Sequence, residues 1–248
     1  PLCSSGYQST TTFSSVFNEI RDVYKLFSDD RSKEIYLRAL QTIVSGIPSQ
    51  IPNANDRLQY FPDDLTFDCD YAFFICCGSY DGENIRKMHQ NIGSVGKMMC
   101  FEPDQKIFPK LEQCAQLYRQ KFSVDITCHN TAISGTIGKK PFTSSGGLGS
   151  RISESGESQV NTTSLDYALL GMRPTFISMD IEGEELNALE GGRRTLKTIR
   201  PGLGISVYHQ PSHLWQVPNF LNGLNAGYRF YLRNYTGFIA ETVLYASV

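Results

Sequence analysis

FFICCGSYDGENI, residues 73–85, is the stretch that decides the fold. It begins as a continuous apolar run, which is typical of a parallel strand buried on both faces. The run ends at Gly78, and a second glycine, Gly82, precedes a segment with helical spacing. Glycines at a strand end let the backbone turn sharply and approach a ligand closely, because no Cβ intervenes. Their G-x-x-x-G spacing differs from the G-x-G-x-x-G of the dinucleotide fingerprint, which disfavours NAD as the ligand.

Short apolar runs alternate with helical segments in both directions from this stretch. Strands are predicted at residues 71–77, 97–101, 124–128, 175–179, 203–208, 228–232 and 238–245. Alternating β and α units are typical of a doubly wound α/β fold with a mostly parallel sheet. We expect the last strand to pair antiparallel at one edge of the sheet. Residues 135–160, rich in Gly, Ser and Thr, are either a hairpin or mobile loop near the site or a surface excursion.

Two amphipathic helices precede the alternating region. Apolar residues at spacings of three and four predict a helix over residues 14–27. A second helix is predicted from Asp29 or Asp30 to Gly46, and residues 47–65 read as a connector rich in Pro and Asn. The sequence therefore predicts an N-terminal helical extension and connector at residues 1–65, followed by a catalytic domain at residues 66–248.

Composition narrows the possible functions. The 248 residues carry a formal net charge of -2, with 19% charged residues of both signs interspersed. This balance gives no general attraction for nucleic acid or for an anionic membrane surface, and no run approaches the length of a membrane span. The seven cysteines form no CxxC pair, so we expect reduced thiols and a cytoplasmic location.

Carboxylates follow two of the predicted strands. Glu102 ends the second strand, where it can accept both hydroxyls of a ribose lying across the first strand's tip; the alternative is that it caps a helix. Asp180 and Glu182 follow the strand at residues 175–179, and ligands of open α/β sheets bind at the carboxyl ends of the strands. Glu184 and Glu185 are expected to be first-turn acids favoured by the helix dipole.

Taken as an ordered set, these motifs resemble the FkbM family of methyltransferases that depend on S-adenosylmethionine (SAM). The resemblance covers residues 71–246 and rests on ICCGSYDG, MMCFEP, NTAIS, TTSLDYALL, ISMDIEGEELNALEGG, ISVYHQPSHLW and ETVLYA. It implies a Rossmann-like fold of the class I methyltransferases with a seven-stranded sheet. We also expect that further domains, such as a glycosyltransferase, can be fused to this one.

The resemblance further implies a role for each matching residue. The loop under the methionine moiety would be formed by Gly78, Ser79, Tyr80, Asp81 and Gly82. Glu102 and Pro103 would lie at the ribose, and the adenine would be bordered by Asn130, Thr131 and Ala132. Asp180 would lie beside both the cofactor and the transferred methyl, where Glu182 and His209 would join it. Two departures stand out, because the family usually has an acid at the position of Cys76 and a Lys at that of Ser178.

The implied reaction is O-methylation, with a hydroxyl of a sugar or glycan as the acceptor. An alcohol needs a general base, and we hypothesise that Asp180 positions the hydroxyl while His209 deprotonates it. The aromatic residues Tyr208, Trp215, Tyr231 and Tyr235 are candidates for stacking on a sugar, or else they belong to the core. No spacing demands a metal, although Asp180 and Glu182 would be its ligands. The alternatives are a catalytically inactive SAM-binding module and, ranked lower, a nicotinamide-dependent oxidoreductase.

Overall fold

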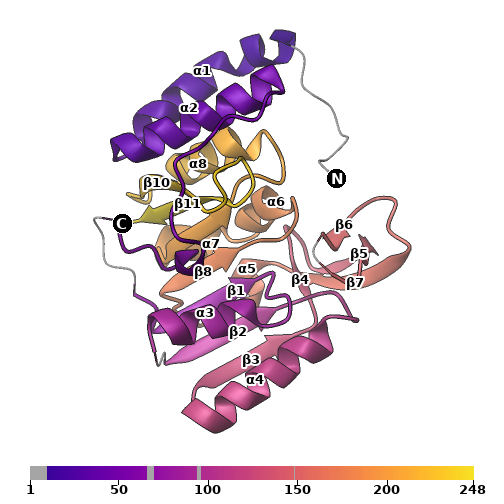
Figure 1. The fold of residues 1–248 in the computed structure, drawn as a ribbon. Helices are drawn as coiled ribbons and strands as arrows, with labels where there is room; N and C mark the ends of the chain where they lie inside the picture. Colours follow the sequence, from indigo (N-terminus) through magenta and orange to yellow (C-terminus); the bar gives the residue numbers. More distant parts are fainter. Residues whose placement is uncertain (1–9, 66–69, 94–95, 148) are drawn as a thin grey trace.

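The computed structural model describes residues 10–65, 70–93, 96–147 and 149–248 of the chain (Figure 1). At its centre lies a seven-stranded sheet in the order β10-β11-β9-β8-β1-β2-β3. Its strands are β1 (Phe73–Cys77), β2 (Lys97–Phe101), β3 (Asp125–His129), β8 (Phe176–Met179), β9 (Gly202–Ser206), β10 (Arg229–Asn234) and β11 (Thr242–Ser247). Neighbours from β3 to β9 pair in parallel, which confirms the predicted fold class.

The position of β11 differs from the expectation. This strand is antiparallel as predicted, but it pairs with both β9 and β10 and therefore lies inside the sheet. β10 forms the edge instead. The sequence pattern could not show this, because an apolar strand near the end of the chain looks the same in either position.

Both faces of the sheet are covered by helices. Side chains alternate along β1, so that Phe74 and Cys76 pack toward α3 (Glu83–Asn91) and α4 (Phe108–Phe122). Ile75 and Cys77 pack into the larger core on the opposite face. The helices that contribute to that core are α5 (Leu165–Ala168), α6 (Glu185–Glu190), α7 (Arg193–Thr198) and α8 (His213–Gly223). Burial on two faces explains why these strands are continuously apolar.

The predicted N-terminal helices are α1 (Thr10–Leu26) and α2 (Asp30–Ser45). Asp29 caps α2 by accepting the backbone N–H of Ser32, and Gly46 ends it in a left-handed conformation at φ 69°. Figure 1 shows both helices at the β10 end of the sheet. Arg233 of β10 is 2% exposed in its side chain and pairs with the partly exposed Asp29 and Asp64, so a buried guanidinium attaches the extension to the sheet.

A second, four-stranded sheet lies near the carboxyl ends of the central strands (Figure 1). It contains β4 (Ala132–Ile133), β5 (Gly138–Thr143), β6 (Arg151–Ile152) and β7 (Ser158–Thr163). β5 and β7 pair antiparallel, as the hairpin alternative for residues 135–160 requires. Few apolar residues suffice here, because the core of this sheet consists mainly of Ala132, Phe142 and Val160.

In the described ranges, no helix combines the length and apolar character that a membrane crossing requires. Cys3 and Cys69 lie outside the described residues, and the other five cysteines are free thiols. The domain boundary at residue 65 remains a prediction, since α1 and α2 contribute residues to the same core as the central strands.

Candidate active site

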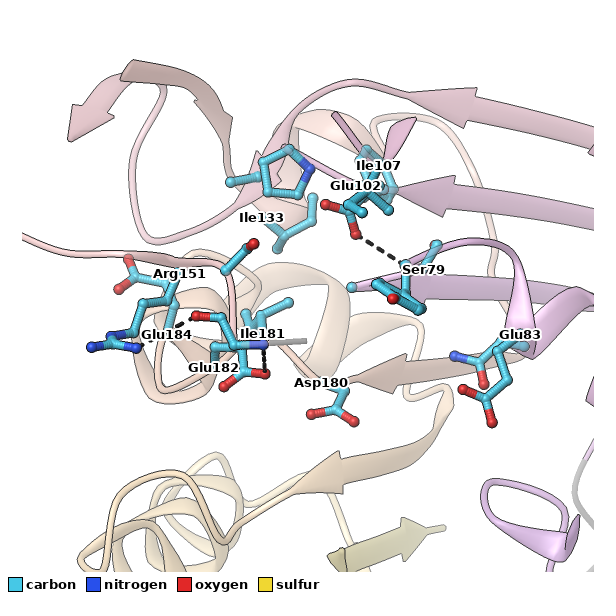
Figure 2. Close-up of a pocket in the computed structure, with 18 of the residues that line it drawn as sticks. Ser79, Glu83, Glu102, Ile107, Ile133, Arg151, Asp180, Ile181, Glu182 and Glu184 are labelled. Carbon is cyan, nitrogen blue, oxygen red and sulfur yellow. Dashed lines mark hydrogen bonds between the residues drawn. The ribbon is translucent and has the colours of Figure 1, made fainter. Parts of the chain in front are cut away.

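A cavity of about 440 Å³ opens at the carboxyl ends of β1, β2 and β8 (Figure 2). It brings together most of the residues that the sequence singled out. The predicted residues on its walls are Gly78, Ser79, Tyr80, Glu102, Pro103, Thr131, Ala132, Asp180 and Glu182. Four others, Asp81, Gly82, Asn130 and His209, lie behind these walls and act through their neighbours, as described below.

The turn after β1 fits closely against β8. Gly78 has φ +80°, and a Cβ there would lie 1.9 Å from the carbonyl oxygen of Asp180. Because neither the conformation nor the space admits a side chain, the elbow requires glycine. Gly82 serves packing instead, since a Cβ there would lie 2.7 Å from Sγ of Cys114. Asp81 pairs with Arg86 at 2.6 Å, so its carboxylate is balanced by a guanidinium on α3.

Glu102 is fixed by backbone donors on both of its oxygens. Oε2 accepts the N–H of Tyr80 at 2.9 Å, and Oε1 accepts the N–H of Asp104 at 2.8 Å. The residue is 7% exposed, and burial raises its pKa to about 7 despite these two hydrogen bonds. Each carboxylate oxygen has further acceptor capacity, so the anchored group can still accept hydroxyl donors from the cavity.

Asn130 holds the backbone that carries Glu102. Its side-chain amide donates to the backbone carbonyls of Glu102 and Pro103 at 2.9 and 3.1 Å. The adjacent Thr131 and Ala132 line the cavity themselves. Asn130 therefore fixes the loop after β2, while the next two residues provide the surface expected to border an adenine.

The acidic turn after β8 is organised by Glu185, which the sequence had suggested was a simple first-turn acid. This side chain is fully buried, and Oε1 accepts the N–H groups of Ile181 and Gly183 at 3.0 and 3.3 Å. It thereby holds a turn in which Glu182 has φ 57° and Gly183 has φ 106°. Glu184 instead contacts Lys140 and Ser134, which ties the turn to the second sheet.

His209 lies behind Asp180 and Glu182 rather than on the cavity surface. Nδ1 is 2.8 Å from Glu185, and Nε2 is 3.3 Å from Asp180 and 3.6 Å from Glu182. Burial by itself would lower the pKa of His209, but its hydrogen bond to Glu185 and the surrounding carboxylates raise that pKa to about 9. For Asp180, burial raises the pKa to about 6, against the lowering effect of His209.

Beyond Asp180, the cavity continues along a wall of polar side chains, of which only Tyr208 was a candidate from the sequence. Tyr60 donates its hydroxyl to Asp180 at 3.2 Å, and Tyr208 donates to Glu241 at 3.0 Å. Gln59 donates to Glu241 at 2.6 Å and accepts from Lys87 at 3.0 Å. These residues come from the connector, α3, the end of β9 and the turn before β11, so no local pattern links them.

The aromatic candidates divide into two groups. Tyr208 and Tyr235 line the cavity, where the hydroxyl of Tyr208 bridges Asp180 and Glu241. Trp215 and Tyr231 are 1% and 2% exposed and belong to hydrophobic cores on opposite faces of the sheet. The alternative that such aromatics are core residues therefore holds for these two.

A seven-stranded sheet of this order, with a glycine elbow at the end of β1 and a carboxylate at the end of the strand on either side of it, is typical of a Rossmann-like methyltransferase domain. The family described as methyltransferase FkbM domain matches residues 77–235. The chain belongs to this family. Membership confirms the methyltransferase prediction with SAM as cofactor, and it leaves the nicotinamide oxidoreductase alternative without support.

Solved structures agree on the fold. The crystal structure of a methyltransferase FkbM from Methylobacillus flagellatus KT has a TM-score of 0.79 and 22% identity, over 95% of this chain and 60% of that one. This chain thus spans about 60% of the length of that relative.

Two further solved structures give lower scores. A putative O-methyltransferase from Klebsiella pneumoniae has a TM-score of 0.44 and 13% identity, over 97% of this chain and 96% of that one. The O-methyltransferase from Bacillus cereus in complex with SAH has a TM-score of 0.43 and 11% identity, over 97% and 92%. A comparison with curated proteins gives no match.

Proposed function

We propose that this chain transfers the methyl group of SAM to a hydroxyl of a sugar or glycan. The observation that carries the proposal is the placement of Glu102 and Asp180 in one cavity, at the ends of β2 and β8, on either side of the elbow at Gly78 (Figure 2). This arrangement offers a nucleoside and a nucleophile adjacent binding positions.

Glu102 supports the cofactor end of the proposal. A carboxylate held by two backbone N–H groups accepts the ribose hydroxyls without having to reorganise. The elbow from Gly78 to Tyr80 brings the backbone next to the methionine moiety, because Gly78 carries no Cβ. A sulfonium methyl held in this way would face the end of β8, where Asp180 lines the cavity.

The reaction itself requires one base and good alignment. The hydroxyl oxygen forms a bond to the methyl carbon, the carbon–sulfur bond breaks, and its electron pair returns to sulfur to give S-adenosylhomocysteine (SAH). The hydroxyl proton passes to a carboxylate oxygen of Asp180. We assign Asp180 this role because it lines the cavity, whereas His209 is 7% exposed and lies behind it. His209 and Glu185 orient the carboxylate.

The polar wall supports a polyhydroxylated acceptor. Glu241 accepts hydrogen bonds, Lys87 and Tyr208 donate them, and Gln59 does both, so a row of donors and acceptors follows the cavity from Asp180. Sugars offer hydroxyls with the same alternation, and the ring of Tyr208 gives an apolar face. Free thiols fit a cytoplasmic location. Fusion to a further domain remains a prediction.

The test uses SAM with a labelled methyl group and a panel of sugars, glycosides and oligosaccharides. We expect a methyl ether, identified by mass spectrometry and NMR, and a loss of at least about 100-fold in turnover for Asp180→Asn. Calorimetry with SAH provides the control, because the variant should still bind nucleoside. Transfer to nitrogen would overturn the hydroxyl assignment, and SAH binding without transfer to any acceptor would favour the inactive SAM-binding module.

A further inference from the structure

Among the buried polar atoms that lack a hydrogen bond in the described residues, Nε2 of His209 lies at the acidic turn, as does Oε2 of Glu185. Nε2 of His209 is fully buried and has no hydrogen-bond partner among the described residues. It points between Asp180 and Glu182, whose nearest oxygens are 3.3 and 3.6 Å away. A buried ring nitrogen held between two carboxylates needs either a proton or a cation on that side.

The distances suit a shared metal ion. Ligand atoms about 2.0–2.2 Å from one ion lie roughly 3–3.6 Å apart in octahedral or tetrahedral geometry. The separations from Nε2 to Oδ1 of Asp180 and to Oε2 of Glu182 fall in this range. Ligand atoms of Asp180, Glu185 and His209 lie within 4.8 Å of one another. Glu182 is not in that group, so its side chain would have to turn toward Asp180 for Oε2 to reach the same ion.

Glu185 supplies the outer contact that a metal-binding histidine needs. Its fully buried carboxylate is 2.8 Å from Nδ1 of His209, which fixes the ring so that Nε2 faces the two other acids. A carboxylate on the far nitrogen sets the tautomer and raises the basicity of a ligating imidazole. Glu185 is thus placed as an orienting residue, while Asp180 and Glu182 are placed as ligands.

The local charge also favours a cation. In the described ranges, the ion pairs of Asp180 and Glu182 are with His209 and with no Lys or Arg. Lys140 is paired with Glu184 and therefore does not balance this group.

We propose that Asp180, Glu182 and His209 form a site for a divalent first-row transition-metal ion, with Oδ1, Oε2 and Nε2 as its protein ligands. One imidazole and two carboxylates are a donor set suited to Mn²⁺ or Zn²⁺ rather than to Ca²⁺. The inference deepens the proposed function, because such an ion would bind the acceptor hydroxyl and lower its pKa. The proton would still pass to a carboxylate oxygen of Asp180.

Metal binding can be measured without cofactor or acceptor. The full chain, treated with chelator and dialysed, is titrated with Mn²⁺, and the free ion is followed by electron paramagnetic resonance. We expect one Mn²⁺ per chain, with binding at least about 10-fold weaker in Asp180→Asn and in Glu182→Gln. Glu185→Gln should weaken binding by about 10- to 100-fold through the loss of the outer contact.

Glu241→Gln is the matched control, since it removes a carboxylate from the same cavity but none of the three ligands. Its Mn²⁺ affinity should stay within about twofold of the unmodified chain. Circular dichroism checks that each variant is folded. Absence of Mn²⁺ and Zn²⁺ binding, or equal binding in Asp180→Asn, would overturn the site. Because SAH binding is measured separately, such a failure leaves the proposed methyl transfer intact.

Discussion

Cys76 of β1 and Ser178 of β8 are register partners on adjacent parallel strands, and both are fully buried. These are the two positions at which the sequence departs from the FkbM pattern, which has an acid at the first and a lysine at the second. The two departures from the pattern that the resemblance implies are therefore neighbours in the sheet, and both are small neutral groups. A charged residue at only one of these positions would be a buried charge without a partner at the other.

This relationship predicts strong coupling between the two positions. Cys76→Asp alone should lower the free energy of unfolding by about 3–5 kcal/mol, because it buries an unpaired carboxylate. Adding Ser178→Lys should recover at least about 1 kcal/mol of that loss. Chemical denaturation of the two single variants and the double variant measures the coupling. Strictly additive losses would show that these side chains do not interact.

Replacing Gly78 should harm folding or SAH binding more than the positive φ angle alone would explain. Gly78→Ala should unfold the turn or abolish SAH binding, since its Cβ would overlap the carbonyl oxygen of Asp180. Gly93→Ala is the control: it has a similar φ of +88° but no atom within 4 Å of a Cβ. We expect Gly93→Ala to cost about 1–2 kcal/mol of stability and to leave SAH affinity unchanged, as measured by calorimetry.

Glu102 predicts a pH dependence of cofactor binding. Burial, with a contribution from the charge of Asp104, raises its pKa to about 7. The ribose hydroxyls donate to the carboxylate form, so SAH affinity should increase as pH rises from about 6 to about 8, by up to tenfold per unit, and level off above that range.

Glu102→Gln removes the titrating group and should bind SAH about 10- to 100-fold more weakly at pH 8. Its affinity should also lose the pH dependence that Glu102 contributes. Calorimetric titrations of both proteins at several pH values make the comparison. An identical pH profile in the two proteins would assign the titration to another group.

The contacts of Glu185 indicate that the folded acidic turn depends on this one buried carboxylate. Glu185→Gln should lower the free energy of unfolding by about 2–4 kcal/mol, because two backbone N–H groups and His209 lose a charged acceptor. Glu190→Gln in the same helix removes an exposed carboxylate paired with Arg193 and should cost less than about 0.5 kcal/mol. Thermal and chemical unfolding of both variants distinguish a supporting role from a general effect of charge.

The spacing of apolar residues along the sequence was sufficient to predict several of the individual strands and helices. Apolar runs and helical spacing gave the strands around residues 73–77 and 97–101 and both N-terminal helices, because side-chain burial repeats with the period of each element. The elbow at Gly78 and the carboxylate of Glu102 also followed from their positions at strand ends. Parallel topology then places such ends at one edge.

Tertiary structure decided which groups meet across the fold. Glu185 and His209 lie 24 positions apart, and Gln59 and Glu241 lie 182 apart, so no periodicity could reveal their hydrogen bonds. The pairing of Cys76 with Ser178 likewise depends on strand order and register. Sequence patterns record burial and backbone preference at each position, whereas the chemistry of the acidic turn arises from long-range contacts that exist only once the sheet has formed.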